Sequence, residues 1–258
     1  MNFDDSFIIA EEKKDKFYKN GFLHLEKVFA TNICNQILSE LSNLETEKVI
    51  NSDIGLSTFI NSIEKTSENF KGISYLTPAN VFCLSINKLM QLKLLSLAST
   101  LLNRKDCFFS YNEIHIRQPK IKHLIPSHQD NFYFSLKEST ALTCYVFLTK
   151  QNRDSGGLGF LPSKIKGNKV ESHSPSKVTG FSSFVQDKED KKDLFEYPDT
   201  NIGDVIFHHC NTFHRADPNH SDTPTVAASL RVFSAGLLDK DKNLEKRYLK
   251  NRTINRSS

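Results

Sequence analysis

Apolar residues in the first hundred positions recur with the spacing of helices. Residues 11–20 are predicted to form a short amphipathic helix that Gly21 stops, and residues 22–25 a brief strand. Thr31 can cap a second helix over residues 32–47, where apolar side chains recur every three or four positions. A leucine-rich face predicts a third helix over residues 86–102, and the polar stretch 48–80 is predicted to form loops and turns.

After residue 106 the pattern changes to short β-rich runs separated by turn residues. The predicted strands are residues 107–118, 142–149, 157–161, 204–209 and 226–234. Helices followed by many short strands favour a mainly β sandwich or barrel with flanking helices over an alternating βαβ fold. We therefore expect one domain over residues 1–238, with a helical flank over about 10–105 and a β core over about 106–238.

The polar segment 163–200 interrupts the predicted β core and contains a run of charges over residues 187–193. It is predicted to be an insertion or a lid, and a solvated surface loop explains the same composition equally well. The sequence contains no GxGxxG or GxxxxGK[ST] phosphate loop, no GxSxG elbow and no internal repeat.

Composition narrows the class of protein. No run of apolar residues approaches the 18 or so that a membrane span needs, and the acidic start of the chain is unlike a secretory signal. Five scattered cysteines, with no CxxC pair, exclude a disulfide scaffold or a zinc ribbon and fit a reducing cytoplasm. We expect a cytoplasmic protein without a membrane partner.

The formal net charge of +4 is concentrated at one end of the chain. Residues 239–258 contain seven Lys or Arg against three Asp or Glu, so this basic C-terminal tail carries the whole excess. Nucleic-acid binding would require a basic stripe within the fold itself. The neutral body therefore argues against a nucleic-acid partner.

The first candidate for metal chemistry is the sequence His128-Gln129-Asp130. On a strand, residues i and i+2 point to the same side, so the imidazole and the carboxylate can converge on one ion. Phe132 and Phe134 would continue that face as an apolar wall. One histidine and one carboxylate at this spacing occur often by chance, so this motif alone is a weak signal.

A distant histidine strengthens the signal. His214 follows a predicted strand and lies 86 residues after His128, a separation that allows several strands to bring the two together. Two histidines and one carboxylate form the facial triad of non-haem Fe(II) oxygenases, which leaves coordination positions open for a cosubstrate and O₂. His208 and His209 compete with His214, but alternation places only one of them on its face, and structural roles are favoured for both.

Four motifs occur in a fixed order: FYKNGFLHLEKVF (17–29), SHQDNFYF (127–134), SGGLGFLPSKIKG (155–167) and GDVIFHHCNTFHRADPNHSD (203–222). Together they resemble the phytanoyl-CoA dioxygenase (PhyH) family of Fe(II)- and 2-oxoglutarate-dependent oxygenases, from about residue 11 to 236. The resemblance implies a double-stranded β-helix (jelly roll), with Fe(II) as the metal and 2-oxoglutarate and O₂ as cosubstrates. Carried over by motif, His128, Asp130 and His214 are the implied iron ligands.

One departure from the family pattern concerns the cation that binds the distal (C5) carboxylate of 2-oxoglutarate. The family usually has an Arg about a dozen residues after the second histidine, whereas residues 223–228 contain no basic side chain. Arg231 shares the strand and, by alternation, the face of Thr225, although six residues of strand span roughly 20 Å. We expect Arg231 to provide this clamp, with Lys120 and Lys122 next in line; a structural salt bridge or a role near the substrate are its alternatives.

The predicted strand before the motif has a polar face that contains Glu113, His115 and Arg117. This face either lines a substrate pocket or is solvated. Gln118, at the end of the strand, is a candidate for a hydrogen bond to the cosubstrate.

The expected activity is hydroxylation of a C–H bond, because Asp130 keeps the carboxylate ligand in place and so disfavours halogenation. Polar and basic side chains between residues 115 and 123 would be costly beside an alkyl chain, so a small polar or anionic metabolite is favoured as substrate. An acyl-CoA or lipid is the alternative substrate. A jelly roll that binds metal without oxygenase chemistry and a non-catalytic binding relative are the alternative functions.

Overall fold

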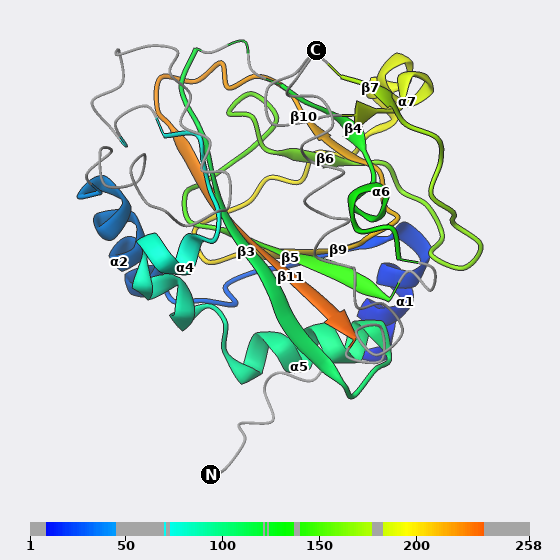
Figure 1. Cartoon of the computed structure of the whole chain (residues 1–258), viewed down its shortest axis with the longest axis horizontal. Coiled ribbons are helices and arrows are strands. Elements are labelled where there is room, and N and C mark those ends of the chain that lie inside the picture. Colours follow the sequence, from blue (N-terminus) through cyan, green and yellow to red (C-terminus); the bar gives the residue numbers. More distant parts are fainter. Residues whose placement is uncertain are drawn as a thin grey trace.

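Two antiparallel sheets face each other in the computed structural model, which describes residues 9–44, 70, 73–120, 122, 124–136, 140–176 and 183–234 (Figure 1). The large sheet has the strand order β1-β9-β5-β11-β3-β2, and the small sheet the order β4-β10-β6. Their strands are β1 (Phe22–Leu25), β2 (Tyr75–Leu76), β3 (Cys107–Arg117), β4 (Ile125–His128), β5 (Ala141–Phe147), β6 (Leu158–Phe160), β9 (Val205–His209), β10 (His214–Ala216) and β11 (Thr225–Ser234).

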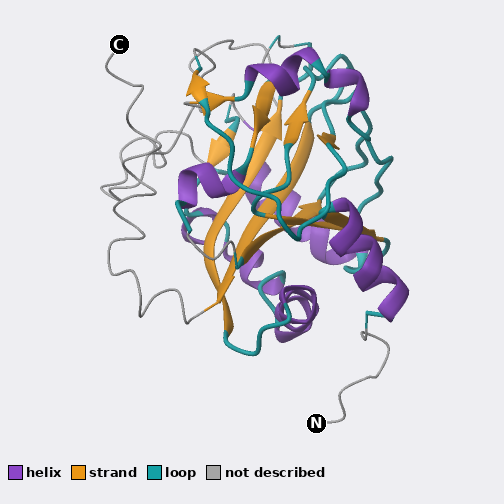
Figure 2. Ribbon diagram, turned by 90° about the vertical axis from the view of Figure 1, so that its right-hand side faces the viewer, coloured by secondary structure: helices purple, strands orange, loops and turns teal. Residues whose placement is uncertain are grey.

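Helices cover the outer face of the large sheet, opposite the small sheet (Figures 1 and 2). The helices of this flank are α1 (Glu11–Asn20), α2 (Thr31–Ser42), α4 (Ala79–Phe82), the 3₁₀ helix η3 (Leu84–Lys88) and α5 (Leu92–Leu102). Within the β region lie α6 (Asp130–Phe134), the hairpin of β7 (Ser174–Pro175) and β8 (Ser183–Phe184), α7 (Gln186–Asp190) and the 3₁₀ helix η4 (Lys192–Leu194). None of the described helices is long and apolar enough to cross a membrane.

Strand β5 shows how the sequence separates the two faces of the large sheet. All seven of its residues are buried. Leu142, Cys144 and Val146 belong to the core shared with the helices, whereas Tyr145 and Phe147 belong to the core between the two sheets. The period of two along a strand therefore assigns alternate residues to packing and to the space between the sheets, where the candidate site lies.

Most predicted elements are confirmed, with shifted boundaries. The helix over residues 11–20 and the strand over 22–25 are confirmed, and the five predicted strands correspond to β3, β5, β6, β9 and β11. Thr31 is the first residue of α2 and makes no capping hydrogen bond, since Ala30 holds the N-cap position, and α2 ends at Ser42. The prediction of a single helix over 86–102 is wrong, because residues 89–91 interrupt it and separate η3 from α5.

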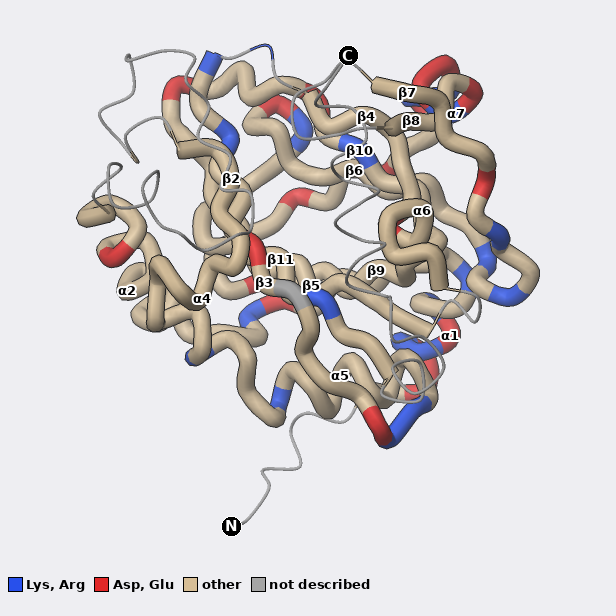
Figure 3. The backbone as a smooth tube through the Cα atoms, viewed as in Figure 1, with Lys and Arg blue, Asp and Glu red and all other residues tan. Residues whose placement is uncertain are grey.

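Short strands were the elements that periodicity missed. β4 and β10 have four and three residues, too few for a recognisable alternation, yet they carry the motif histidines. The polar stretch 48–80 contains β2 and the first two residues of α4 in its described part. The basic tail over residues 239–258 lies outside the described residues, and Lys and Arg are interspersed with Asp and Glu along the described backbone (Figure 3).

Gly203 lies in the turn before β9, where the backbone conformation and the neighbouring chain leave no room for a side chain. Its φ is +87°, and a Cβ built on it would lie 2.1 Å from the backbone oxygen of Phe29, whose amide donates to the Gly203 carbonyl. We expect Gly203→Ala to lower the free energy of unfolding by roughly 2–5 kcal/mol, the sum of the left-handed penalty and overpacking against backbone.

Gly167→Ala is the matched control for Gly203→Ala. Gly167 also has a positive φ, +84°, but nothing lies within 4 Å of its Cβ position. Only the conformational penalty of about 1–2 kcal/mol is therefore expected. Urea unfolding of both variants measures the difference, and equal losses would contradict a role for the contact with Phe29.

Candidate metal centre

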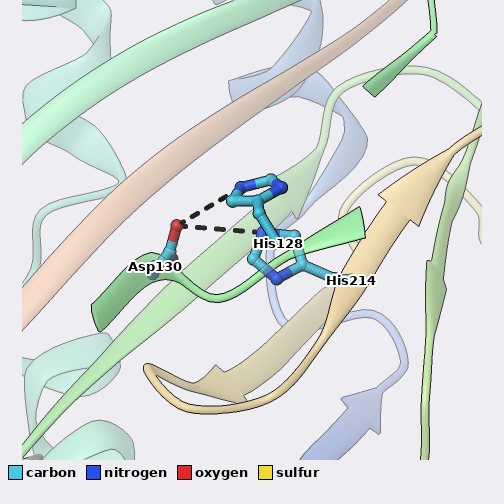
Figure 4. A group of neighbouring side chains, drawn as sticks. All are labelled: His128, Asp130 and His214. Carbon is cyan, nitrogen blue, oxygen red and sulfur yellow. Dashed lines mark ion pairs between the residues drawn. The ribbon is translucent and has the colours of Figure 1, made fainter. Parts of the chain in front are cut away.

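Strands β4 and β10 bring the two motif histidines together. In their antiparallel pairing His214 lies opposite His128, and the two imidazole centroids are 4.2 Å apart. Gln129 alone separates β4 from Asp130, which is the first residue of α6. Ligand atoms of the three side chains all lie within 4.8 Å of one another, and all three residues are buried (Figure 4).

The local structure of this motif differs from the predicted strand. After Gln129 the chain turns into the short helix α6, so Asp130 reaches the site from a helix N-terminus. The predicted apolar wall is consequently wrong. Phe134 packs edge-on against Phe233 at a centroid distance of 5.0 Å, and Phe132 stacks on the His173 ring at 4.2 Å.

Hydrogen bonds to the backbone set the tautomer of both histidines. His128 Nδ1 lies 2.8 Å from the carbonyl oxygen of Pro126, and His214 Nδ1 lies 3.1 Å from that of Thr212. A carbonyl only accepts, so each Nδ1 carries the hydrogen and each Nε2 keeps its lone pair. These Nε2 atoms lie 3.9 and 3.8 Å from Asp130 Oδ1, and such orientation of imidazoles by a second hydrogen bond is typical of metal ligands.

Electrostatics also favour ligands that are ready to bind a cation. Burial lowers the pKa of His128 to about 3 and that of His214 to about 4, so both imidazoles are neutral at pH 7. Burial opposes ionisation of Asp130, but Arg231 and then His214 hold the pKa of this carboxyl below its ordinary value. Thr143 Oγ1 donates to Asp130 Oδ2 at 2.7 Å and so fixes the carboxylate, with Oδ1 the oxygen nearer the histidines. The donor set of two neutral imidazoles and one carboxylate fits a divalent transition metal.

These shifts predict that the metal-free protein loses stability in mild acid. Burial lowers the pKa of His128, His214 and His208, the last to about 4, below the 6.5 of an unfolded histidine. Below pH 6.5 the unfolded chain therefore binds more protons, and the free energy of unfolding falls by up to about 1.4 kcal/mol per pH unit for each histidine. Urea unfolding at pH 7 and pH 5 measures this slope. His208→Gln should reduce it by one histidine's share, and equal stability at the two pH values would contradict the prediction.

A pocket opens at the triad, with roughly 330 Å³ of empty space that includes open solvent. Strand alternation places His208, and not His209, on the side of His214. The ring of His208 lies 4.4 Å from that of His214 and lines this pocket, whereas His209 is not among the lining residues. The pocket is lined by His115, Ile125, His128, Asp130, Thr143, Tyr145, Leu158, His208, His214, Ser229 and Arg231.

Arg231 lies in this pocket beside the metal ligands. Its Nη2 is 3.7 Å from Asp130 Oδ1, and its Nη1 forms an ion pair with Glu113. Glu113 in turn accepts a hydrogen bond from Tyr75 and lies 3.4 Å from His115 Nε2. The polar face predicted for this strand is therefore a buried wall and not a solvated surface, and a clamp on the distal carboxylate by Arg231 stays a prediction.

Other candidates lie further away. Gln118 follows β3 and donates from Nε2 to the Ile73 carbonyl at 3.0 Å; it is not a lining residue, and its contact with a cosubstrate stays a prediction. Lys120 pairs with Asp222 at 2.7 Å, and both side chains are largely exposed. Lys122 is exposed as well.

The described part of the segment 163–200 packs against β4, the strand that contains His128. The Val185 amide donates to the Ser127 carbonyl at 2.9 Å, and Glu189 accepts from the Ser127 amide. Further along, Gln129 Oε1 accepts from the Glu171 amide at 2.8 Å, and its Nε2 donates to the Asn211 carbonyl at 2.7 Å. This part of the segment is thus tied to β4, unlike a freely solvated loop.

Several residues of the site were missed from the sequence. Thr143 and Tyr145 are the polar members of an otherwise apolar strand, a signal that could have identified them as pocket residues. Gln129 looked like a spacer between two ligands, and its fully buried side chain links three segments instead. The pairing of Glu113 with Arg231 joins residues 118 positions apart, which no local pattern reveals.

Comparison with known proteins agrees with this geometry. The sequence profile described as Phytanoyl-CoA dioxygenase (PhyH) matches residues 17–226. No curated protein matches the chain in sequence.

Solved structures of similar fold include three that are named for iron or 2-oxoglutarate. The non-heme alpha ketoglutarate dependent carbocyclase SnoK from nogalamycin biosynthesis is 18% identical, with a TM-score of 0.65 over 88% of this chain and 85% of SnoK. EvdO2 from Micromonospora carbonacea var. aurantiaca, complexed with 2-oxoglutarate, is 18% identical, with a TM-score of 0.67 over 88% and 92%. EctD from S. alaskensis with bound Fe is 17% identical, with a TM-score of 0.67 over 92% and 80%. At these identities the likeness shows the fold, so the predicted jelly roll is confirmed.

Proposed function

Because the chain belongs to the phytanoyl-CoA dioxygenase family of Fe(II)- and 2-oxoglutarate-dependent oxygenases, we propose that His128, Asp130 and His214 hold Fe(II) in this protein. We further propose that the enzyme hydroxylates a C–H bond of a small polar or anionic metabolite. The observation that carries the proposal is the convergence of two Nε2 atoms and one carboxylate oxygen in a buried pocket, with both Nδ1 atoms tied to the backbone.

Iron and 2-oxoglutarate, when bound, would supply the activation of O₂, in which 2-oxoglutarate is converted to succinate and CO₂. The protein supplies geometry around them. Hydrogen bonds from Nδ1 hold the imidazoles of His128 and His214, and Thr143 holds Asp130. Three protein ligands on one face leave the opposite positions free for cosubstrate and O₂. Ile125, Tyr145 and Leu158 of the core between the sheets form part of the pocket wall.

The walls of the pocket support a small polar substrate. His115, Ser229 and Arg231 present polar groups beside the triad, and Ile125 and Leu158 are its only aliphatic lining residues within the described chain. The two phenylalanines that would have favoured a long alkyl chain pack elsewhere. A buried alkyl chain would displace water from these polar side chains and offer them no hydrogen bond of its own, which disfavours an acyl-CoA or lipid.

Hydroxylation is the outcome that intact triad ligands favour, although SnoK, of similar fold, is described as a carbocyclase. The five free cysteines fit the further proposal that the enzyme acts in the reducing cytoplasm. Family membership disfavours the two alternative functions, a metal-binding jelly roll without oxygenase chemistry and a non-catalytic relative.

The test is coupled turnover by the purified protein with Fe(II), 2-oxoglutarate and O₂. Succinate release and loss of substrate are measured against a panel of small anionic metabolites and a panel of acyl-CoAs. The proposal expects one succinate per hydroxylated product with a member of the first panel, and addition of a metal chelator should stop both reactions. Coupling to acyl-CoAs alone would refute the substrate class, and absence of succinate release with every candidate would refute the oxygenase activity.

A further inference from the structure

Two buried arginines face the space between the sheets at different levels of the large sheet. On β11, Arg231 lies opposite Thr143 of β5, Ser229 opposite Tyr145, and Thr225 opposite Arg117 of β3. Directly opposed residues of antiparallel strands share a face, and so do alternate residues along one strand. Arg231 therefore stands at the level of the metal ligands and Arg117 at the far end of the same face, with Tyr145 between them.

The position of Arg231 argues against a contact with the far end of 2-oxoglutarate. Its Nη2 is 3.7 Å from Asp130 Oδ1, a ligand oxygen, and its Nη1 is engaged by Glu113. The metal-binding carboxylate and keto group of 2-oxoglutarate are separated from the distal carboxylate by three C–C bonds of about 1.5 Å each. A cation for that carboxylate is therefore needed beyond the triad, further along the large sheet.

Arg117 lies further along the sheet, at the Thr225 end of β11 and outside the lining of the pocket at the triad. Its side chain is buried, its Nη2 donates to the Asp217 carbonyl at 2.7 Å, and a Cβ on Gly156 would lie 2.7 Å from its Nε. The carboxylate of Asp217 is committed to Arg153 and Arg215, at 2.9 and 2.8 Å. Burial lowers the pKa of Arg117 to about 10, against the attraction of Tyr145 and Asp217, so its guanidinium is still a cation at pH 7.

We propose that Arg117 anchors the distal carboxylate of 2-oxoglutarate, and that Arg231 faces the substrate at the metal end of the pocket. This inference rests on the proposed function. Guanidinium suits the task because its planar fork binds a carboxylate through two hydrogen bonds. The Tyr145 hydroxyl, on the face between the two arginines, lies along the path of the cosubstrate chain.

The test separates the distal carboxylate from the rest of the cosubstrate. Protein loaded with Mn(II) in place of Fe(II) is titrated by calorimetry with 2-oxoglutarate and with 2-oxopentanoate, the same chain with a methyl group in place of the distal carboxylate. Arg117→Gln should lower the affinity for 2-oxoglutarate about 10- to 100-fold, the scale of charged hydrogen bonds, and leave that for 2-oxopentanoate unchanged. Arg117→Lys, which keeps the charge without the fork, should lose less.

Two further variants sharpen the assignment. Thr225 lies opposite Arg117, so the double variant Arg117→Ala/Thr225→Arg places a guanidinium on the neighbouring strand and should restore part of the preference for 2-oxoglutarate. The pair Glu113→Gln/Arg231→Gln removes the other arginine without leaving a lone buried charge, and should keep the preference for 2-oxoglutarate over 2-oxopentanoate.

The outcomes distinguish the inference from the function on which it rests. A full preference for 2-oxoglutarate in Arg117→Gln, or its loss in the Glu113→Gln/Arg231→Gln pair, would overturn the assignment and favour Arg231. Unchanged Mn(II) affinity shows that a variant is folded; if Arg117→Gln does not bind Mn(II), Arg117→Lys carries the test. A wild-type protein that binds Mn(II) but neither 2-oxo acid would refute the proposed function itself.

Discussion

Replacing His128, Asp130 or His214 by Ala, one at a time, should each lower the affinity for Fe(II) by more than 100-fold. Loss of groups that merely orient a ligand typically lowers metal affinity 10- to 100-fold, and removal of the ligand itself exceeds that. Each side chain is buried and offers one of the three ligand atoms that lie within 4.8 Å of one another in the described part of the chain. Anaerobic Fe(II) titration and metal analysis of the purified variants measure the effect.

The control for the triad variants is His209→Gln, next along β9 from a pocket histidine. His209 is also buried, but its Nδ1 accepts the Asn211 amide at 3.2 Å, and it does not line the pocket. Iron affinity should therefore be retained in this variant even if stability falls. Normal iron content in any of the three triad variants would remove that residue from the site.

Breaking the buried pair of Arg231 and Glu113 should lower the free energy of unfolding strongly. Glu113 has 1% of its side chain exposed and Arg231 11%, so Arg231→Met leaves a carboxylate that water does not reach. Removing one partner of a buried ion pair costs about 3–5 kcal/mol, most of it from the charge left behind. Urea unfolding of the metal-free protein measures this loss.

The double variant Glu113→Gln/Arg231→Met also removes the Glu113 carboxylate, the charge that the single variant leaves buried. It should recover most of the lost stability, since a neutral amide can keep a hydrogen bond with Tyr75. Lys14→Met, which breaks the exposed pair with Glu11, is the comparison and should change stability little. A single Arg231→Met variant as stable as wild type would show that the pair is not a structural element.

The fold class and the triad were accessible from the sequence because they depend on local signals. Alternation on β5, β9 and β11 identified the sheet, and the motif around His128 together with His214 identified the candidate ligands. The helix that carries Asp130 was not accessible, because a five-residue helix is shorter than the window in which helical periodicity is visible. Its misreading as a strand produced the wrong apolar wall.

The roles proposed for the two arginines were not accessible from the sequence, because the argument for them depends on strand register. Counting along one strand pointed to Arg231 as the only Arg after Arg215 and before the tail. The pairing of β3 with β11 adds Arg117, which lies 108 residues before Thr225 and directly opposite it. A one-residue change in that register would turn Arg117 to the other face of the sheet, and no local pattern encodes it.

The contacts around Ser127 have a consequence for solubility. β4 is one of the two edge strands of the small sheet, and an unpaired edge strand can pair with the strand of another chain. Here both backbone groups of Ser127 are occupied, the carbonyl by Val185 and the amide by the Glu189 carboxylate. Val185 and Glu189 thus cover the edge of β4 next to His128. We expect a proteolytic cut between residues 183 and 189 to expose the edge of β4 beside His128 and so to promote aggregation.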